Sequence, residues 1–146
     1  MGEKFFTSKQ ATKIIGCSLR QLQYWREKEI IVPTIEGSGT GRSIYYSSSD
    51  LVQLAIMEYL LSVGLSFAIA SWGLKELIKS DPDYADPESQ KRWMLCWDDK
   101  KRTERSGSLI LLEFDREEAI VLLDKGLAVI PVWLDKIHQQ LKNKIG

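Results

Sequence analysis

The 146-residue sequence predicts an α+β fold that is mainly α-helical, and three observations indicate this class. Apolar residues recur at helical spacing through much of the first half and again near the C-terminus. A glycine-rich stretch followed by strand-forming aromatic residues interrupts the first half, which is typical of a β-hairpin. Two apolar, strand-like runs separated by a long charged turn follow an acidic segment with two prolines. The composition, 44% hydrophobic and 27% charged, is that of a globular chain.

Two short helices are expected near the N-terminus. Thr7 or Ser8 can cap a first helix that runs to Gly16, and glycine suits the left-handed residue that ends a helix. Ser18 is a second cap candidate and would open a helix over residues 19–28. Two helices separated by so brief a turn match a helix-turn-helix motif.

The expected second helix has an apolar side and a polar side. At 100° per residue, Leu19, Leu22 and Trp25 share the side that would pack on the first helix. The other side carries groups that can reach base edges and phosphates: Arg20, Gln23, Tyr24 and Lys28. A solvated helix surface that binds nothing is the alternative interpretation.

A basic hairpin and a third helix are expected next. Residues 36–42 are glycine-rich and predict a hairpin tip, residues 42–46 have strand propensity, and Ser47 to Leu51 supply caps for a helix. Helix, turn, helix and hairpin in this order predict a winged helix-turn-helix. Up to residue 46 there are seven Lys and Arg against four Asp and Glu, a net charge of +3. The neutral total of 20 basic and 20 acidic residues therefore conceals a basic N-terminal region.

These segments resemble the MerR family of bacterial transcription regulators. The resemblance covers about residues 5–79 and implies a winged helix-turn-helix domain over residues 1–79 that binds double-stranded DNA. Five segments carry it, in the family's order: Phe6–Ser18, Arg20–Trp25, Ile30–Pro33, Tyr46–Leu51 and Gly64–Phe67.

The sequence departs from the family pattern at four positions. Gln23 stands where many members have arginine, and Arg26 where an acidic residue is usual. Glu29 stands where glycine commonly permits a left-handed turn. Ile44 occupies a wing position that often holds arginine, a role that Arg42 can take. We expect these changes to affect sequence preference and wing geometry rather than the fold.

The resemblance ends near residue 80. Asp81-Pro82 is expected to stop the fourth helix near Lys79, and residues 80–92 are predicted to form an acidic linker. Residues 93–146 are predicted to form a small dimerisation region, a strand hairpin with helices. Its expected elements are strands over 93–97 and 109–114, a helix from Asp115 to about Lys125, and a last helix after Pro131. In size and layout the whole chain is similar to the small MerR-type repressors of type V-K CRISPR-associated transposons.

The predicted function is a sequence-specific, DNA-binding repressor without a dedicated effector domain. We expect the second helix to enter the major groove, the wing to touch the flanking backbone, and Thr7 and Ser18 to hold phosphates through hydroxyls and backbone amides. The residues are Arg20, Gln21, Gln23, Tyr24 and Lys28 in the groove, and Arg42, Ser43 and Tyr45 on the wing.

A homodimer that binds a pseudo-palindromic operator is expected, because a single DNA-binding domain makes too few contacts for tight specific binding. The predicted interface combines a strand with apolar groups on both faces and one stripe of the last helix: Leu109, Leu111, Leu134, Ile137, Leu141 and Ile145. A strand buried inside the chain is the alternative.

The sequence offers no grouping typical of an enzyme or a metal site. The single His138 lacks an oriented nucleophile, and Cys17 and Cys96 are too few for a metal site within one chain. We therefore expect no enzyme activity and no cofactor. No apolar run reaches the roughly 18–20 residues that span a bilayer, and no secretory signal is evident, so a cytoplasmic protein without a membrane partner is expected.

Two alternatives to a repressor stay open from the sequence. An excisionase-like accessory protein would share the DNA-binding head but shape DNA for a recombinase. A protein-interaction module with a vestigial head would lack the steep salt dependence that marks DNA binding.

Overall fold

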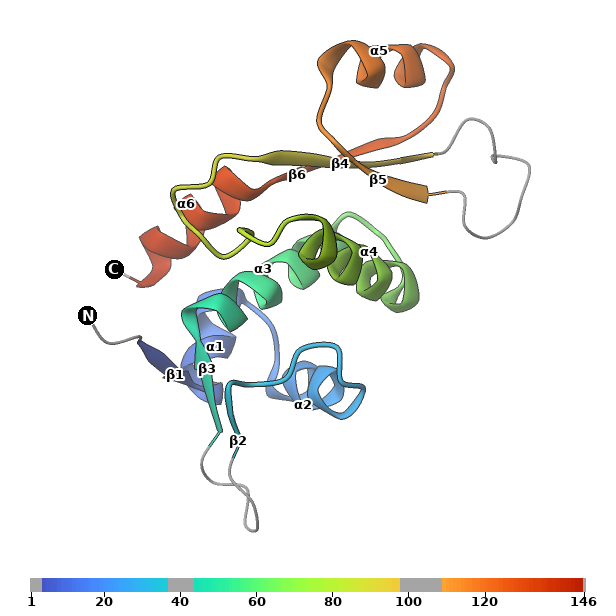
Figure 1. Cartoon of the computed structure of the whole chain (residues 1–146). Coiled ribbons are helices and arrows are strands. Elements are labelled where there is room, and N and C mark those ends of the chain that lie inside the picture. Colours follow the sequence, from blue (N-terminus) through green and yellow to red (C-terminus); the bar gives the residue numbers. More distant parts are fainter. Residues whose placement is uncertain (1–3, 37–43, 98–108, 146) are drawn as a thin grey trace. The chain divides into compact units, whose positions relative to one another are not determined.

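The computed structural model describes residues 4–36, 44–97 and 109–145 (Figure 1). Within these residues it has six helices and six strands in two small antiparallel sheets, which confirms the predicted α+β, mainly α class. The chain divides into two compact units, Met1–Lys75 with Ile137–Gly146, and Glu76–Lys136. The predicted functional division into 1–79, 80–92 and 93–146 stays a prediction, whereas the packing groups the last ten residues with the N-terminal unit.

The first unit contains the predicted pair of short helices and the hairpin base. Its helices pack around buried aliphatic and aromatic side chains that include Leu22, Trp25 and Tyr46. The elements are β1 (Phe5–Thr7), α1 (Ser8–Ile15), α2 (Leu19–Glu27), β2 (Ile35–Glu36), β3 (Ile44–Ser47), α3 (Ser48–Ser62), the first part of α4 (Phe67–Ser80) and most of α6 (Leu134–Ile145).

Three helices of this unit begin with the same reciprocal cap. Thr7, Ser18 and Ser47 accept hydrogen bonds from the backbone three residues on, and the side chain at that position accepts from the cap backbone. This capping box satisfies two otherwise unpaired N–H groups at each helix start. The predicted starts of these helices are confirmed.

The sheet of the first unit has the strand order β1-β3-β2. Phe6 pairs with Tyr46, and Ile35 pairs with Tyr45, so β3 is the central strand. Sequence patterning predicted β3 but missed β1, which is only three residues long. The sheet holds the base of the hairpin against the start of α3, because β3 runs directly into that helix.

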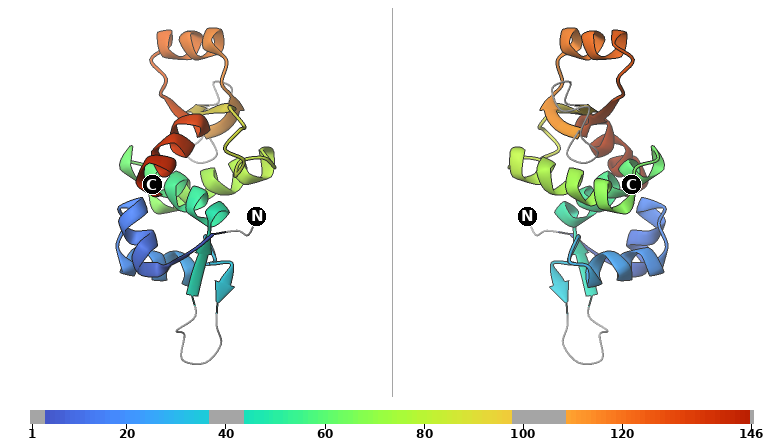
Figure 2. Two further views of the ribbon diagram at one scale, coloured as in Figure 1. Left: turned by 90° about the vertical axis from the view of Figure 1, so that its left-hand side faces the viewer. Right: turned by 90° about the vertical axis from the view of Figure 1, so that its right-hand side faces the viewer.

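The second unit is built on a sheet with the strand order β5-β4-β6. The prediction of only two strands here was wrong, because a third strand pairs with the other side of β4. A single helix joins β5 to β6 and lies to one side of the sheet (Figure 2). The elements are β4 (Arg92–Trp97), β5 (Leu109–Glu113), α5 (Arg116–Asp124) and β6 (Val129–Trp133).

The segment between α4 and β4 is a series of hydrogen-bonded turns. α4 ends at Ser80, as the following prolines predicted. Asp81 is fully buried, and its carboxylate accepts a 3.0 Å bond from the indole Nε1 of Trp93. A second polar contact joins Arg92 to Asp135 through two bonds of 2.9 and 3.1 Å, and this bidentate contact lowers the pKa of the Asp135 carboxyl.

No helix in the described part of the chain is long and apolar enough to cross a membrane. Nor do three His, Cys, Asp or Glu side chains come together there as ligands around a metal ion would.

Candidate nucleic-acid interface

α2 places one side in the core and the other in solvent. Leu22 and Trp25 are each only 2% exposed, as predicted for the packed side. Leu19, predicted on the same side, is 58% exposed instead. It is the first residue of the helix, and helical side chains lean toward the N-terminus, so no turn of α2 lies beneath it.

The solvent side of α2 carries the predicted polar groups. Arg20 is exposed and forms no hydrogen bond or ion pair with the described residues. Gln23 is exposed and donates a 3.0 Å hydrogen bond to Glu27 one turn later. A bond on the surface between exposed side chains exchanges readily with water, so Gln23 can still donate to a ligand.

Tyr24 differs from its neighbours because its ring already has partners. The ring lies 5.0 Å from that of Phe67 at the start of α4, and the amine of Lys28 lies 5.7 Å from its centre. Both contacts hold the ring, which is still 43% exposed. Tyr24 therefore joins α2 to α4 while presenting part of its surface to solvent.

Three predicted contact residues are used in helix capping. The hydroxyls of Thr7 and Ser18 accept bonds from Gln10 and Gln21, and their own backbone N–H groups donate to the same two side chains. Their backbone amides are therefore occupied, and each hydroxyl keeps its hydrogen as a donor. Gln21 was predicted to read bases, but its carbonyl oxygen is engaged in the cap. The Ser-x-x-Gln spacing is the sequence signal that identifies this role.

The wing base lies at one end of β3. Tyr45 is 37% exposed and pairs with Thr7 on one side and Ile35 on the other, which places it beside the start of α1. The predicted wing contacts Arg42 and Ser43 lie outside the described residues.

A buried carboxylate fastens this wing base to α3. The Oδ2 atom of Asp50 accepts three hydrogen bonds, from the backbone and hydroxyl of Thr34 at 2.8 and 2.7 Å and from the backbone of Ser47 at 2.9 Å. Asp50 is buried, so its bond to Ser47 is shielded from water and its bonds to Thr34 are partly shielded. Sequence analysis identified Ser47 as a cap but did not anticipate the long-range bonds to Thr34.

The comparison with known families decides what this arrangement is. Residues 6–71 match the family model described as MerR HTH family regulatory protein. These residues form a MerR-family helix-turn-helix domain. The match covers α1, α2, α3, the wing base and the start of α4, which lie within the part of the chain for which the resemblance was predicted.

Three curated relatives match a stretch of 57 residues of this chain. Uncharacterized HTH-type transcriptional regulators of Mycobacterium bovis and of two Mycobacterium tuberculosis strains are 39% identical to the chain over 57 residues. That stretch is 38% of this chain and 25% of each relative, so the chain spans about a quarter of the length of these relatives. The likeness to repressors of CRISPR-associated transposons stays a prediction.

The MerR-family domain contains an unusual helix end. α2 closes with bonds from Ile30 N to Trp25 O and from Glu29 N to Arg26 O, the Schellman arrangement, with Glu29 at a φ of +57°. The same arrangement closes α3 and α5 with Gly64 and Gly126 at the corresponding position. Glu29 thus adopts the left-handed conformation that glycine takes at the other two helix ends, at a cost of about 1–2 kcal/mol.

We expect Glu29→Gly to raise the free energy of unfolding by about 0.5–1 kcal/mol, because relief of the left-handed strain exceeds the added entropy of the unfolded chain. Urea unfolding followed by circular dichroism measures the change. Glu27→Gly, within the same helix, is the matched control and should lower stability by about 1 kcal/mol. A loss of stability in both variants would contradict this account of Glu29.

The turn between α1 and α2 covers a buried thiol. Burial and the nearby Glu58 carboxylate raise the pKa of the Cys17 thiol to about 11. At neutral pH the thiol is therefore protonated and acts as a small apolar group. Burial also raises the pKa of Glu58, whose Oε2 atom is buried and has no hydrogen-bond partner among the residues that the structure describes.

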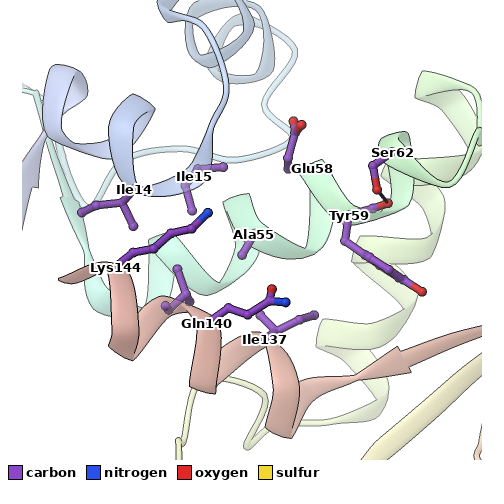
Figure 3. A pocket seen from close by; sticks show the side chains of 10 residues that line it. Ile14, Ile15, Ala55, Glu58, Tyr59, Ser62, Ile137, Gln140 and Lys144 are labelled. Atoms are coloured by element: carbon purple, nitrogen blue, oxygen red, sulfur yellow. Dashed lines mark hydrogen bonds between the residues drawn. The ribbon is translucent and has the colours of Figure 1, made fainter. Parts of the chain in front are cut away.

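A pocket of about 220 Å³ lies in the first unit, which contains the MerR-family domain, where α6 meets α1 and α3 (Figure 3). Its walls include Ile14, Ala55 and Ile137, and the side chain of Lys144 extends along it. The last helix therefore packs on the DNA-binding unit of its own chain.

The residues predicted for the dimer interface differ in burial. Leu134, Ile137 and Leu141 are buried within the single chain, Leu134 completely, so one copy already covers most of the helical stripe. Ile145 is half-buried, as are Leu109 and Leu111 on β5. A dimer interface on any of them stays a prediction, and β5 is the part of the set that is still accessible.

Proposed function

We propose that the chain is a sequence-specific, double-stranded-DNA-binding transcription regulator that acts as a homodimeric repressor in the cytoplasm. The observation that supports this most directly is the MerR-family domain, which presents Arg20, Gln23 and Lys28 on the solvent side of α2. A guanidinium, an amide and an amine on one exposed helix face are the groups that bind guanine, adenine and phosphate in a major groove.

Each group has a different role in this proposal. Arg20 lies in the first turn of α2 and would reach a base edge, because residues near the start of a recognition helix lie deepest in the groove. Lys28, at the end of the helix, is suited to a backbone phosphate. The hydroxyls of Thr7 and Ser18 keep a hydrogen to donate to phosphates, and Tyr45 lies beside Thr7 at the wing base.

Repression by occupancy fits these features. A dimer bound to two half-sites of a pseudo-palindromic operator excludes polymerase without any further chemistry, and it needs only the DNA contacts and a second copy. The likeness of the mycobacterial relatives, which are named as transcriptional regulators, supports the same role for the domain.

Arg20→Ala is expected to weaken operator binding by roughly 1–3 kcal/mol, about 5- to 150-fold, because a bidentate base contact is lost. Mobility-shift titration with the DNA upstream of the protein's own gene measures this. Arg116→Ala is the matched control, since Arg116 is an equally exposed arginine on α5 in the other unit. Wild-type affinity should also fall steeply with added salt.

Two results would contradict the proposal. Undiminished binding by Arg20→Ala would remove Arg20 from the interface. An equal loss with Arg116→Ala would show that the effect is general electrostatic attraction rather than a contact made by α2.

A further inference from the structure

We propose that two copies of this chain join through β5, whose outer edge pairs antiparallel with β5 of the second copy. The two three-stranded sheets would then form one continuous six-stranded sheet with the order β6-β4-β5-β5-β4-β6. This inference deepens the proposed function, because it assigns the surface of the homodimer.

The register of the sheet shows which groups β5 offers at its outer edge. Phe114 donates its backbone N–H to Arg92 at 2.8 Å, so Phe114, and by alternation Leu112 and Ile110, point their backbone groups at β4. The N–H and C=O groups of Leu109, Leu111 and Glu113 therefore point away from β4. No described residue pairs with this row.

The opposite edge of the sheet is different. The bonds from β4 to β5 use Arg92, Met94 and Cys96, so the alternate residues of β4 face β6. Pro131 is opposite Met94, and its nitrogen therefore lies on the outer edge of β6. Since proline has no N–H, the middle of that edge cannot donate a hydrogen bond, a common protection against strand addition.

β5 lacks a proline of this kind. Its sequence, Leu-Ile-Leu-Leu-Glu, contains no proline and no lysine, and its four aliphatic residues are half-buried rather than enclosed. An apolar edge strand of this kind attracts another strand unless it is covered. Pairing would satisfy the outward row and cover aliphatic side chains on both faces of the strand.

A second copy of β5 matches this edge better than an unrelated peptide does. The outward residues are spaced symmetrically about Leu111, so a two-fold axis there pairs Leu111 with itself and each Leu109 with the partner's Glu113. Every outward donor then meets an outward acceptor, as an isologous contact requires. The two Glu113 carboxylates lie at opposite ends of the pair, about 13 Å apart, so they do not repel each other strongly.

Light scattering of the full-length protein tests the pairing. We expect a dimer for the wild type, and an increase of roughly tenfold or more in the dimer dissociation constant for Leu111→Pro, because two backbone bonds at the axis are lost. The precedent of Pro131 in β6 shows that this sheet accepts proline where the nitrogen faces outward. Circular dichroism and thermal unfolding check that the variant is folded.

Two further variants separate strand pairing from side-chain packing. Leu111→Ala keeps the backbone donor, so it should weaken the dimer much less than Leu111→Pro does. Glu113→Pro removes an outward donor near the exposed end of β5 and should weaken the dimer even if Leu111→Pro does not fold. A monomeric wild type would overturn the proposal. Unchanged dimerisation in the folded proline variants, or equal weakening by Leu111→Ala and Leu111→Pro, would do so as well.

Measuring both dimerisation and operator binding on the wild type and these variants tests the β5 interface and the DNA-binding role separately. A dimer that is disrupted by the proline variants but binds no DNA would support the interface and overturn the DNA-binding role. A monomer that binds the operator and responds to Arg20→Ala would do the reverse.

Discussion

Asp50→Ala is expected to lower the free energy of unfolding of the MerR-family unit by about 3–5 kcal/mol. The substitution removes the acceptor of three short hydrogen bonds and leaves the backbone N–H groups of Ser47, which is buried, and of Thr34, which is partly buried, without their acceptor. Each unsatisfied buried group costs about 1–3 kcal/mol, and the lost bond from Ser47 is one half of the capping box of α3. The chain that connects α2 to the wing would no longer be fixed to α3.

Thermal unfolding followed by circular dichroism measures this loss, and operator affinity at 37 °C should fall with it. Ser48→Ala is the matched control, because Ser48 lies two residues earlier in the same helix turn but is exposed. An Asp50→Ala variant as stable as Ser48→Ala would show that solvent replaces the lost bonds, and that Asp50 does not hold the wing base.

Trp93→Phe is expected to destabilise the second unit by about 2–4 kcal/mol. Phenylalanine fills most of the space but cannot donate to the fully buried carboxylate of Asp81, which would then lose its 3.0 Å indole bond. The backbone N–H of Asp81 bonds to Leu77 at the end of α4, so the loss would reach that helix end as well.

A double-variant cycle isolates the pair. Asp81→Ala in the Trp93→Phe background should cost much less than Asp81→Ala alone, because replacing both partners leaves no unpaired buried charge. Trp97→Phe, on the same strand but half-buried, is the control for loss of ring area. Additive effects of the two substitutions would contradict an energetic link between Asp81 and Trp93.

The local elements of the fold could be predicted because their signals lie within a few residues. Thr7, Ser18 and Ser47 each precede a helix, and a cap acts on the next turn of the chain. At Glu29 the family resemblance places glycine, and this departure was expected to affect wing geometry. The structure shows that Glu29 keeps the left-handed conformation instead.

The missed features depend on contacts between distant residues. Pro131 obscured β6, because proline usually breaks a strand and only the register shows that its nitrogen faces outward. The stripe with Ile137 and Leu141 predicted an apolar contact correctly, but sequence alone cannot distinguish a partner copy from the chain's own N-terminal unit. Gln21 was assigned to DNA although its spacing from Ser18 already matched a capping box.

The return of the last helix to the MerR-family unit has a consequence for synthesis on the ribosome. Residues 76–136 form a unit that is continuous in sequence, so it can fold while the chain is still emerging. The DNA-binding unit needs residues 137–146 to complete its packing, and these are translated about a hundred residues after α1 and α2. A product cut short before Ile137 therefore lacks part of the DNA-binding unit's core. Unfinished copies would compete poorly with complete ones for the operator.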